Sequence, residues 1–337
     1  MQYYGTLGPS CSSVDTLVKM FQAGMTGVRL NLSHGNLDEN GHWLEMLFEA
    51  AKRCKVHQPQ VLIDLQGPEL RLGKIYKQIT INEGDQVIFG DGGIPVPKIF
   101  LAYAGIGDRL LVDDGKLEFT VEFAQPLFIS ARVTRGGGIK SGKSLAIVGK
   151  ELPMPTLTEN DRKNIGLASQ YGVTGVMLPF VRGKEDLLTL RRALEDAGAG
   201  HVKIFAKIEN MQGVNALEEL LPYCDHVVIA RGDLGNAMPL WKLPGVQKEL
   251  AFKCRQADKP FMVVTQMLDS MHERAVPTRA EVLDIYNAVL DGASSLMLTG
   301  ETAAGKYPAE AMDYLVKTGR EAEADQNFCF CRCFAQR

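Results

Sequence analysis

The sequence predicts an α/β fold, a (β/α)8 TIM barrel that carries an inserted small β-barrel-like domain, and three observations support this. Short apolar runs alternate with amphipathic helical stretches, which is the pattern of βαβ units and a parallel sheet. Eight of each can be counted, which is the number that closes a barrel. The alternation stops over one glycine-rich interval, and the 337-residue chain exceeds the roughly 250 residues of a minimal barrel. A doubly wound open sheet stays the alternative, because periodicity does not establish closure.

The expected barrel strands are short apolar runs that end in polar residues. They cover residues 2–6, 28–30, 61–64, 175–178, 202–206, 226–230, 261–265 and 295–298. The helical stretches cover residues 13–22, 37–56, 159–171, 184–197, 213–221, 245–256, 279–290 and 309–323. We therefore expect the barrel to be built from residues 1–73 and 149–323.

The interval 74–148 interrupts the alternation after the third strand. β-prone segments occur at 78–81, 86–89, 109–112, 117–123 and 127–133, and Gly136, Gly137 and Gly138 are expected to form a tight turn. We expect a small inserted β domain that closes over the barrel mouth as a lid and excludes water. Residues 324–337 show no fold pattern and are expected to be a disordered, cysteine-rich tail.

The composition argues against several classes of partner. The net charge is −3, with 45% hydrophobic and 23% charged residues, so nothing attracts the chain to nucleic acid or to a membrane surface. No apolar run approaches the ~20 residues that span a bilayer, and the N-terminus lacks a signal-peptide pattern. The seven cysteines are an odd, scattered set rather than a disulfide framework. A cytoplasmic location is therefore expected.

The most informative residues are charged side chains at the ends of the fifth and sixth expected strands. The fifth run ends in Lys207 and Glu209, and the sixth ends in Arg231 and Asp233. In a parallel barrel the C-terminal strand ends converge on one mouth, where active sites lie. Two carboxylates and a lysine there suit a divalent metal and an anionic substrate.

The second and third strands add further polar groups at their ends. Arg29, Asn31 and Ser33 alternate, so their side chains are expected to share one face. Asp64 supplies a hard anionic oxygen suited to a monovalent or divalent cation. Each of these residues, taken singly, could instead satisfy backbone groups at a strand end.

Two hydroxyls and one histidine complete the set of candidate residues. Thr265 and Thr299 come at the ends of the seventh and eighth strands, where a hydroxyl can position a proton or a water at a reacting carbon. His34 follows Ser33, and a ligand contact and an ordinary loop position are equally compatible with it.

At these residues the chain resembles the pyruvate kinase family, whose motifs occur in order from residue 4 to about residue 323. The matching stretches are Thr6-Leu7-Gly8-Pro9, Gly24-Met25, Arg29-Leu30-Asn31-Leu32-Ser33-His34-Gly35, Asp64-Leu65-Gln66-Gly67-Pro68-Glu69-Leu70-Arg71, Val112-Asp113-Asp114-Gly115, Lys207-Ile208-Glu209-Asn210, Arg231-Gly232-Asp233-Leu234-Gly235, Thr265-Gln266-Met267-Leu268 and Gly300-Glu301-Thr302-Ala303. The resemblance implies a (β/α)8 barrel with an inserted β domain. It also implies transfer of the phosphoryl group of phosphoenolpyruvate to ADP, giving ATP and pyruvate.

The resemblance implies a charged site for the phosphoryl group and its metal. Lys207 and Arg29 would neutralise the transferring phosphoryl, and Glu209 and Asp233 would hold Mg²⁺ (or Mn²⁺). The backbone amides of Gly232 and Asp233 would bind the substrate carboxylate. The implied K⁺ ligands are the side chains of Asn31, Ser33 and Asp64 and the carbonyl of Leu65.

The remaining implied roles concern proton transfer and the nucleotide. Thr299 and Thr265 would relay a proton to the enolpyruvate carbon, and Thr265 would also contact the substrate. The residues facing ADP or ATP would be Arg29, His34 and Lys143. Glu69 resembles the residue that accompanies K⁺ dependence in the family, where a lysine accompanies K⁺ independence, so K⁺ activation is expected.

The chain also departs from the family pattern. Thr299 replaces a serine, Gln66 replaces a lysine, and an unusual Ser-Leu-Ala-Ile-Val-Gly follows Lys143, on the nucleotide side. The family continues past this chain's end with an allosteric C-terminal domain. We therefore expect an enzyme without the usual effector site, acting as a homodimer through the barrel or as a monomer. The alternatives are a pyruvate-enolate lyase or decarboxylase that needs no nucleotide, and an inactive regulatory paralogue.

Overall fold

The computed structural model describes the backbone of residues 1–113, 115–150 and 152–334, and the side chains of these ranges except 34 and 326–334. The chain divides into two compact units. The first comprises Met1–Gly67 and Thr156–Arg337, and the second comprises Pro68–Pro155. The second unit includes the interval 74–148 that the sequence analysis assigns to an inserted domain.

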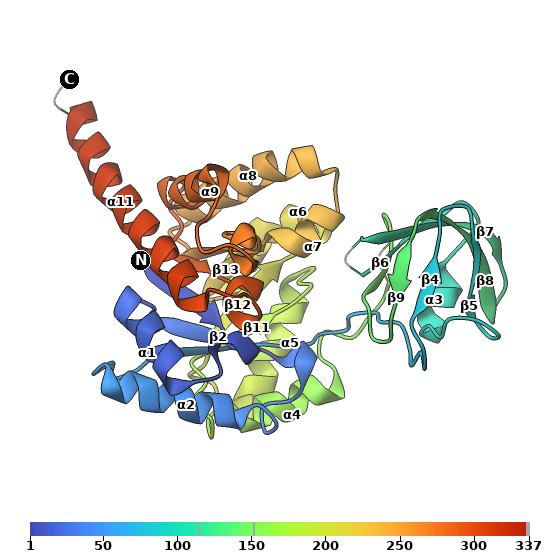
Figure 1. Ribbon diagram of the computed structural model, residues 1–337, viewed down its shortest axis with the longest axis horizontal. Helices are drawn as coiled ribbons and strands as arrows, with labels where there is room; N and C mark the ends of the chain where they lie inside the picture. Colours follow the sequence, from blue (N-terminus) through green and yellow to red (C-terminus); the bar gives the residue numbers. More distant parts are fainter. Residues whose placement is uncertain (114, 151, 335–337) are drawn as a thin grey trace. The chain divides into compact units, whose positions relative to one another are not determined.

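The first unit contains a closed barrel of eight parallel strands (Figure 1). The strands are β1 (Gln2–Thr6), β2 (Gly27–Asn31), β3 (Gln60–Asp64), β11 (Gly175–Leu178), β12 (Lys203–Ile208), β13 (His226–Ala230), β14 (Phe261–Val264) and β15 (Ser295–Met297). They pair in this order, and β15 pairs with β1 through Tyr3 and Leu296, so the sheet closes on itself. The predicted (β/α)8 barrel is confirmed, and the open doubly wound sheet is excluded.

Helices follow the strands and surround the barrel. They are α1 (Val14–Ala23), α2 (Gly41–Arg53), α4 (Glu159–Leu167), α5 (Lys184–Asp196), α6 (Met211–Leu220), α7 (Arg231–Asn236), α8 (Leu243–Gln256), α9 (Arg279–Leu290), α10 (Gly300–Ala303) and α11 (Pro308–Phe334). The sequence pattern does not predict the short helices α7 and α10. The last helix was expected to end at residue 323, whereas α11 continues to Phe334. The side chains of Cys329, Cys331 and Cys333 lie outside the described residues, as do residues 335–337.

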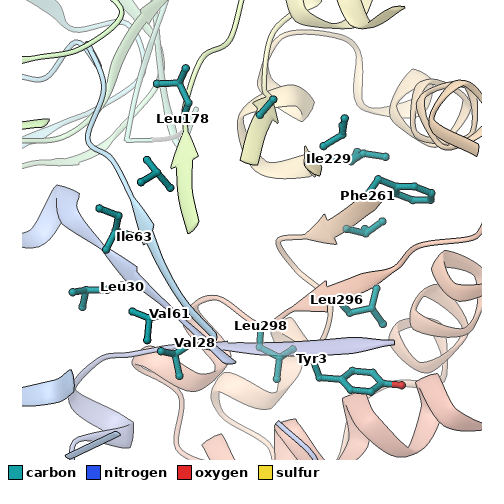
Figure 2. Close-up of a cluster of buried hydrophobic side chains, with 14 of the residues drawn as sticks. Tyr3, Val28, Leu30, Val61, Ile63, Leu178, Ile229, Phe261, Leu296 and Leu298 are labelled. Carbon is teal, nitrogen blue, oxygen red and sulfur yellow. The ribbon is translucent and has the colours of Figure 1, made fainter. Parts of the chain in front are cut away.

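The barrel strands bury both of their faces, because neighbouring residues point to opposite sides of a strand. Tyr3 belongs to the large core between the strands and the helices, whereas Tyr4 belongs to a separate core inside the barrel. Figure 2 shows part of this outer core. Its labelled side chains come from barrel strands, such as Tyr3 of β1 and Phe261 of β14, or from the residue after a strand, such as Leu298. Both faces are apolar, which explains why the barrel strands read as continuous apolar runs.

Side-chain caps fix where several helices begin. Asn210 directly follows Glu209 and caps α6, because its Oδ1 accepts the N–H of Gly213 at 2.8 Å. Thr158 and Asp161 form a capping box at α4. The Oδ1 of buried Asp161 also accepts the N–H of Gln66 at 3.0 Å. This carboxylate therefore ties the loop after β3 to α4 and limits its movement.

The second unit is a β structure with its own core. A five-stranded antiparallel sheet contains β10 (Leu145–Ile147), β6 (Arg109–Val112), β7 (Leu117–Ala124), β8 (Phe128–Arg135) and β5 (Gln86–Gly90), in that order. A two-stranded sheet pairs β4 (Ile79–Ile81) with β9 (Gly137–Ile139), and α3 (Lys98–Tyr103) is the unit's α-helix among the described residues.

The glycine run of the second unit does not form the predicted tight turn. Gly137 and Gly138 belong to β9 and pair with Ile81 and Thr80. A Cβ on Gly136 would lie 2.5 Å from the carbonyl oxygen of Ile81. The glycines therefore allow two backbones to approach closely, which sequence patterns do not distinguish from a turn.

In the described part of the chain, no helix combines the length and the apolar character needed to cross a membrane.

Candidate active site

Four ionisable side chains from the ends of three strands, β2, β3 and β12, form one buried cluster at the C-terminal end of the barrel. Arg29 lies on β2, Asp64 is the last residue of β3, Lys207 lies near the end of β12, and Glu209 immediately follows β12. The exposed fraction of each side chain is at most 14%. The strand that separates β3 from β12 is β11, so the cluster spans the barrel mouth rather than one pair of neighbours.

Asp64 is the central acceptor of this cluster. Its Oδ2 accepts hydrogen bonds from Arg29 Nε at 2.8 Å and Nη2 at 2.6 Å, and its Oδ1 lies 3.1 Å from Lys207 Nζ. Burial alone would raise the pKa of Asp64, but the two cations outweigh burial and lower it. Asp64 is therefore ionised at neutral pH.

Lys207 lies between two carboxylates. Its Nζ is 3.1 Å from Asp64 and 2.8 Å from Glu209 Oε1. Burial opposes its charge, but the two anions raise the pKa of Lys207 above the ordinary value. The second oxygen of Glu209 accepts the backbone N–H of Phe180 at 2.8 Å. Phe180 has a φ of +53°, an uncommon conformation for a bulky residue, so the loop after β11 is held in a defined shape at this site.

The polar contacts continue around the mouth from Arg29. Its Nη1 is 3.4 Å from the hydroxyl of Thr6 at the end of β1, and that hydroxyl donates to the carbonyl of Leu298 at 2.9 Å. The cluster is thereby connected with the loop that contains Thr299.

Asn31 lies opposite Asp64 in the register of β2 and β3, and Leu65 directly follows Asp64. The predicted alternation of Arg29, Asn31 and Ser33 is only partly correct. β2 ends at Asn31, and Ser33 belongs to a 3₁₀ turn, η2 (Leu32–His34). Asn31 Oδ1 accepts the N–H of Ser33 at 3.1 Å and so caps this turn. Only Arg29 and Asn31 therefore share a strand face. The side chain of His34 lies outside the described residues.

Gly232 and Asp233 lie in the first turn of α7, directly after β13. The first N–H groups of a helix have no acceptor within the helix and can donate hydrogen bonds to an anionic group. A Cβ on Gly232 would lie 3.1 Å from Thr265 Cγ2 and 3.7 Å from its hydroxyl oxygen. The first turn of α7 and the side chain of Thr265 are therefore in close proximity.

The two threonine loops are joined by a buried carboxylate. Glu301 Oε2 accepts the N–H of Thr299 at 2.7 Å and its hydroxyl at 3.2 Å. The other oxygen, Oε1, accepts the N–H of Leu268 at 3.1 Å, in the loop that begins with Thr265. Thr265 lies just beyond the end of β14, with a φ of +77°.

Lys143 and Glu69 belong to the second unit and are described within it. The Nζ of Lys143 lies 2.9 Å from Asp113 Oδ1. Burial tends to raise the pKa of Asp113, but Lys143 and Lys116 lower it, so the carboxylate is ionised. Glu69 pairs with Arg71, whose Nη1 donates to the carbonyl of Gly142 beside Lys143.

The donors at the barrel mouth suit hard cations. Oδ1 of Asp64 is buried and accepts no hydrogen bond in good geometry, although Lys207 Nζ is nearby. Such an oxygen is a suitable ligand for K⁺. Glu209 and Asp233 offer carboxylate oxygens, which Mg²⁺ prefers. Among the described residues, no three His, Cys, Asp or Glu side chains group as a metal site.

The sequence pattern predicts no role for Arg231 or Glu301, which the structure connects to the site. Arg231 binds the backbone of the Thr265 loop, and Glu301 bridges the Thr265 and Thr299 loops. The sequence already places Arg231 among the charged residues at the strand ends, and Glu301 lies about one turn after β15, but position alone does not predict the contacts that either residue makes.

The fold and this cluster define a (β/α)8-barrel protein with a separate β unit and an ionised lysine–carboxylate site at the C-terminal strand ends. The chain matches the family model "Pyruvate kinase, barrel domain" over residues 2–312. The chain belongs to the pyruvate kinase family.

Similar proteins named pyruvate kinase come from distant organisms. The protein of Geobacillus stearothermophilus is 39% identical over 319 residues, covering 91% of this chain and 54% of the relative. That of Aeropyrum pernix is 37% identical, covering 94% of this chain and 69% of the relative. That of Schizosaccharomyces pombe is 36% identical, covering 95% and 65% respectively. The chain thus spans little more than half of the length of some curated relatives that it matches.

Proposed function

We propose that this protein transfers the phosphoryl group of phosphoenolpyruvate to ADP, giving ATP and pyruvate. The observation that carries the proposal is the buried Arg29–Asp64–Lys207–Glu209 cluster, with its charged lysine at the barrel mouth. The proposal is also supported by the similar proteins, which are named pyruvate kinase.

Lys207 and Arg29 are the residues proposed to stabilise the transferring phosphoryl group. Phosphoryl transfer needs little covalent chemistry from the protein and depends on positioning and on charge stabilisation. The raised pKa of Lys207 keeps its ammonium charged throughout the physiological range. Because Asp64 and Glu209 hold this ammonium from two sides, its position is fixed before a substrate binds.

Glu209 and Asp233 are the proposed Mg²⁺ ligands. When bound, the metal would supply positive charge between the phosphoryl group and the substrate oxygens. The amides of Gly232 and Asp233, at the start of α7, are proposed to receive the substrate carboxylate.

Thr299 and Thr265 are proposed to guide a proton to carbon after phosphoryl transfer. In the reaction the bond from phosphorus to the enol oxygen breaks, and a bond to the terminal phosphate oxygen of ADP forms. The enolpyruvate left behind must gain one proton at its methylene carbon to become pyruvate. The hydroxyl of Thr299 donates a hydrogen bond to Glu301, and the side chain of Thr265 lies beside Gly232.

A K⁺ ion is proposed to bind the side chains of Asn31, Ser33 and Asp64 and the carbonyl of Leu65. The buried Oδ1 of Asp64 supports this, because it lacks a well-aligned hydrogen bond. Arg29, His34 and Lys143 are proposed to face the nucleotide. Lys143 would exchange its contact with Asp113 for phosphate, which its partly exposed position permits.

The proposed partner beyond the substrates is a second copy of the chain, bound through the barrel. The short turn η4 (Leu240–Lys242) exposes 82% of Trp241 and 68% of Leu240, which is unusual for large apolar side chains. Light scattering would show a dimer that Trp241→Glu converts to a monomer. A wild-type monomer at micromolar concentration would refute the pairing.

Four free cysteines among the described residues suit a reducing compartment such as the cytoplasm.

The test of the proposed function is pyruvate release by the purified protein from phosphoenolpyruvate, Mg²⁺ and ADP, with K⁺ or Na⁺. ADP-dependent release that K⁺ stimulates is the expected result. A folded protein that releases no pyruvate refutes the proposal. Oxaloacetate turnover without nucleotide would then favour the lyase, and inactivity with both substrates would favour a regulatory paralogue.

A further inference from the structure

The Arg231 guanidinium is hydrogen-bonded to groups of the protein itself. Its side chain is 12% exposed, and its Nη1 donates to both oxygens of Asp284 on α9, at 2.9 and 2.7 Å. The Nε and Nη2 groups donate to the carbonyl of Thr265, at 3.1 and 2.7 Å, and Nη2 lies 3.3 Å from the carbonyl of Gln266. Every nitrogen of the guanidinium therefore has a protein acceptor.

The two residues whose carbonyls Arg231 binds, Thr265 and Gln266, have a strained backbone. Thr265 has a φ of +77° and Gln266 a φ of +53°. A β-branched residue in the left-handed region is rare, and such a conformation persists only when its surroundings enforce it. Arg231 binds the carbonyls of both residues and thereby fixes the two peptide planes that follow them.

The strained conformation determines where the Thr265 side chain lies. Its Cγ2 and hydroxyl oxygen lie 3.1 and 3.7 Å from the position of a Cβ on Gly232. Gly232 follows Arg231 directly in α7. The same short helix therefore contains Arg231, which binds the backbone of Thr265, and Gly232, against which the side chain of Thr265 lies.

We propose that Arg231, held by Asp284, is a positioning residue that fixes the Thr265 hydroxyl at the start of α7. The inference rests on the proposed function, in which this hydroxyl guides a proton to the enolpyruvate carbon. Arg231 acts through the backbone of Thr265 and does not touch the substrate. Its loss therefore affects turnover through Thr265 rather than through substrate charge.

The experiment is a double-mutant cycle of Arg231→Met and Thr265→Ala, with kcat and KM for phosphoenolpyruvate measured in the Mg²⁺- and K⁺-containing protein. Displacement of a catalytic group by about 1 Å costs up to about 100-fold. We expect Arg231→Met to lower kcat about 10- to 100-fold with a smaller change in KM. In the Thr265→Ala background the same change should lower kcat less than about threefold, because the group it positions is gone.

Arg191→Met is the matched control. Arg191 also pairs with an aspartate, Asp225, and donates to two carbonyls, those of Gly200 and Val202, but in the α5–β12 connection. It should leave kcat within about twofold of wild type. Arg231→Lys keeps the positive charge but loses the planar set of guanidinium donors, so its kcat should lie between those of Arg231→Met and wild type.

Asp284→Asn weakens the anchor of Arg231 and should cause a smaller loss of kcat in the same direction. Together with Arg231→Lys it provides the test if Arg231→Met does not fold. Additive losses in the cycle, or an equal loss in Arg191→Met, would overturn the role of Arg231. A wild-type protein that forms no pyruvate would instead refute the proposed function itself.

Discussion

Replacement of Asp64 by asparagine tests whether the buried charge cluster exists as described. The wild-type cluster balances two cations, Arg29 and Lys207, with two carboxylates, Asp64 and Glu209. The variant removes one negative charge from a side chain that is 2% exposed and leaves two buried cations beside a single anion. Loss of one partner of a buried ion pair typically costs about 3–5 kcal/mol.

We take the lower end, about 3 kcal/mol, as the expected fall in the free energy of unfolding, because the asparagine amide oxygen can still accept one hydrogen bond from Arg29. For a domain of this size each kcal/mol shifts Tm by roughly 2–4 °C, so the expected fall is about 6–12 °C at pH 7. The lowered pKa of Asp64 means that wild type loses the same stabilisation only at acid pH, as the carboxylate protonates.

The assay is thermal unfolding of wild type and variant at pH 7, with Asp313→Asn as the control. Asp313 pairs with Lys317 on the exposed face of α11, where an ion pair contributes about 0–1 kcal/mol. An Asp64→Asn variant whose Tm equals that of the control would refute the description of the cluster as a set of mutually stabilising buried charges.

Three further predictions concern the metal, the monovalent cation and the pH dependence of stability. Glu209→Ala should weaken Mn²⁺ binding at least about tenfold in a titration, whereas Glu249→Ala, on the exposed side of α8, should not. Equal affinities of the two variants would remove Glu209 from the metal site. Glu69→Lys should reduce the ratio of activity in K⁺ to activity in Na⁺, and an unchanged ratio would separate Glu69 from the cation requirement. His226 is buried between Phe205 and the hydroxyls of Ser294 and Ser295, and burial lowers its pKa to about 4. The unfolded chain binds a proton at this histidine near pH 6.5, so stability should fall by up to roughly 3 kcal/mol between pH 6.5 and pH 4. A pH profile of unfolding that His226→Gln leaves unchanged would contradict this.

The barrel could be predicted from the sequence because its strands bury both faces. Runs such as Val227–Ala230 contain only apolar residues, and polar groups appear where a strand leaves the barrel. The positions of Lys207 and Glu209 at the mouth follow from the same rule, since all C-terminal strand ends of a parallel barrel meet there. The mutual pairing of Lys207 with Asp64 does not follow, because these residues lie on strands separated by β11.

The parts that were not predicted depend on backbone conformation. α7 begins at Arg231 after Ala230, which offers no side-chain cap, so no capping signal indicated a helix. Thr265 was expected to end a strand, but it adopts a positive φ that its β-branched side chain disfavours. That conformation depends on tertiary contacts with Arg231, and no local sequence pattern encodes them.

The most direct test of the central claim compares pyruvate formation from phosphoenolpyruvate and ADP by wild type and by Lys207→Met, with Mn²⁺ binding measured on both. Removal of one well-placed charge at a reacting centre costs about 100- to 1000-fold in kcat. We expect an active wild type and a fall of this size in a variant that is folded and still binds Mn²⁺. A Lys207→Met variant that retains wild-type kcat would contradict the assignment of the buried cluster as the phosphoryl-transfer site.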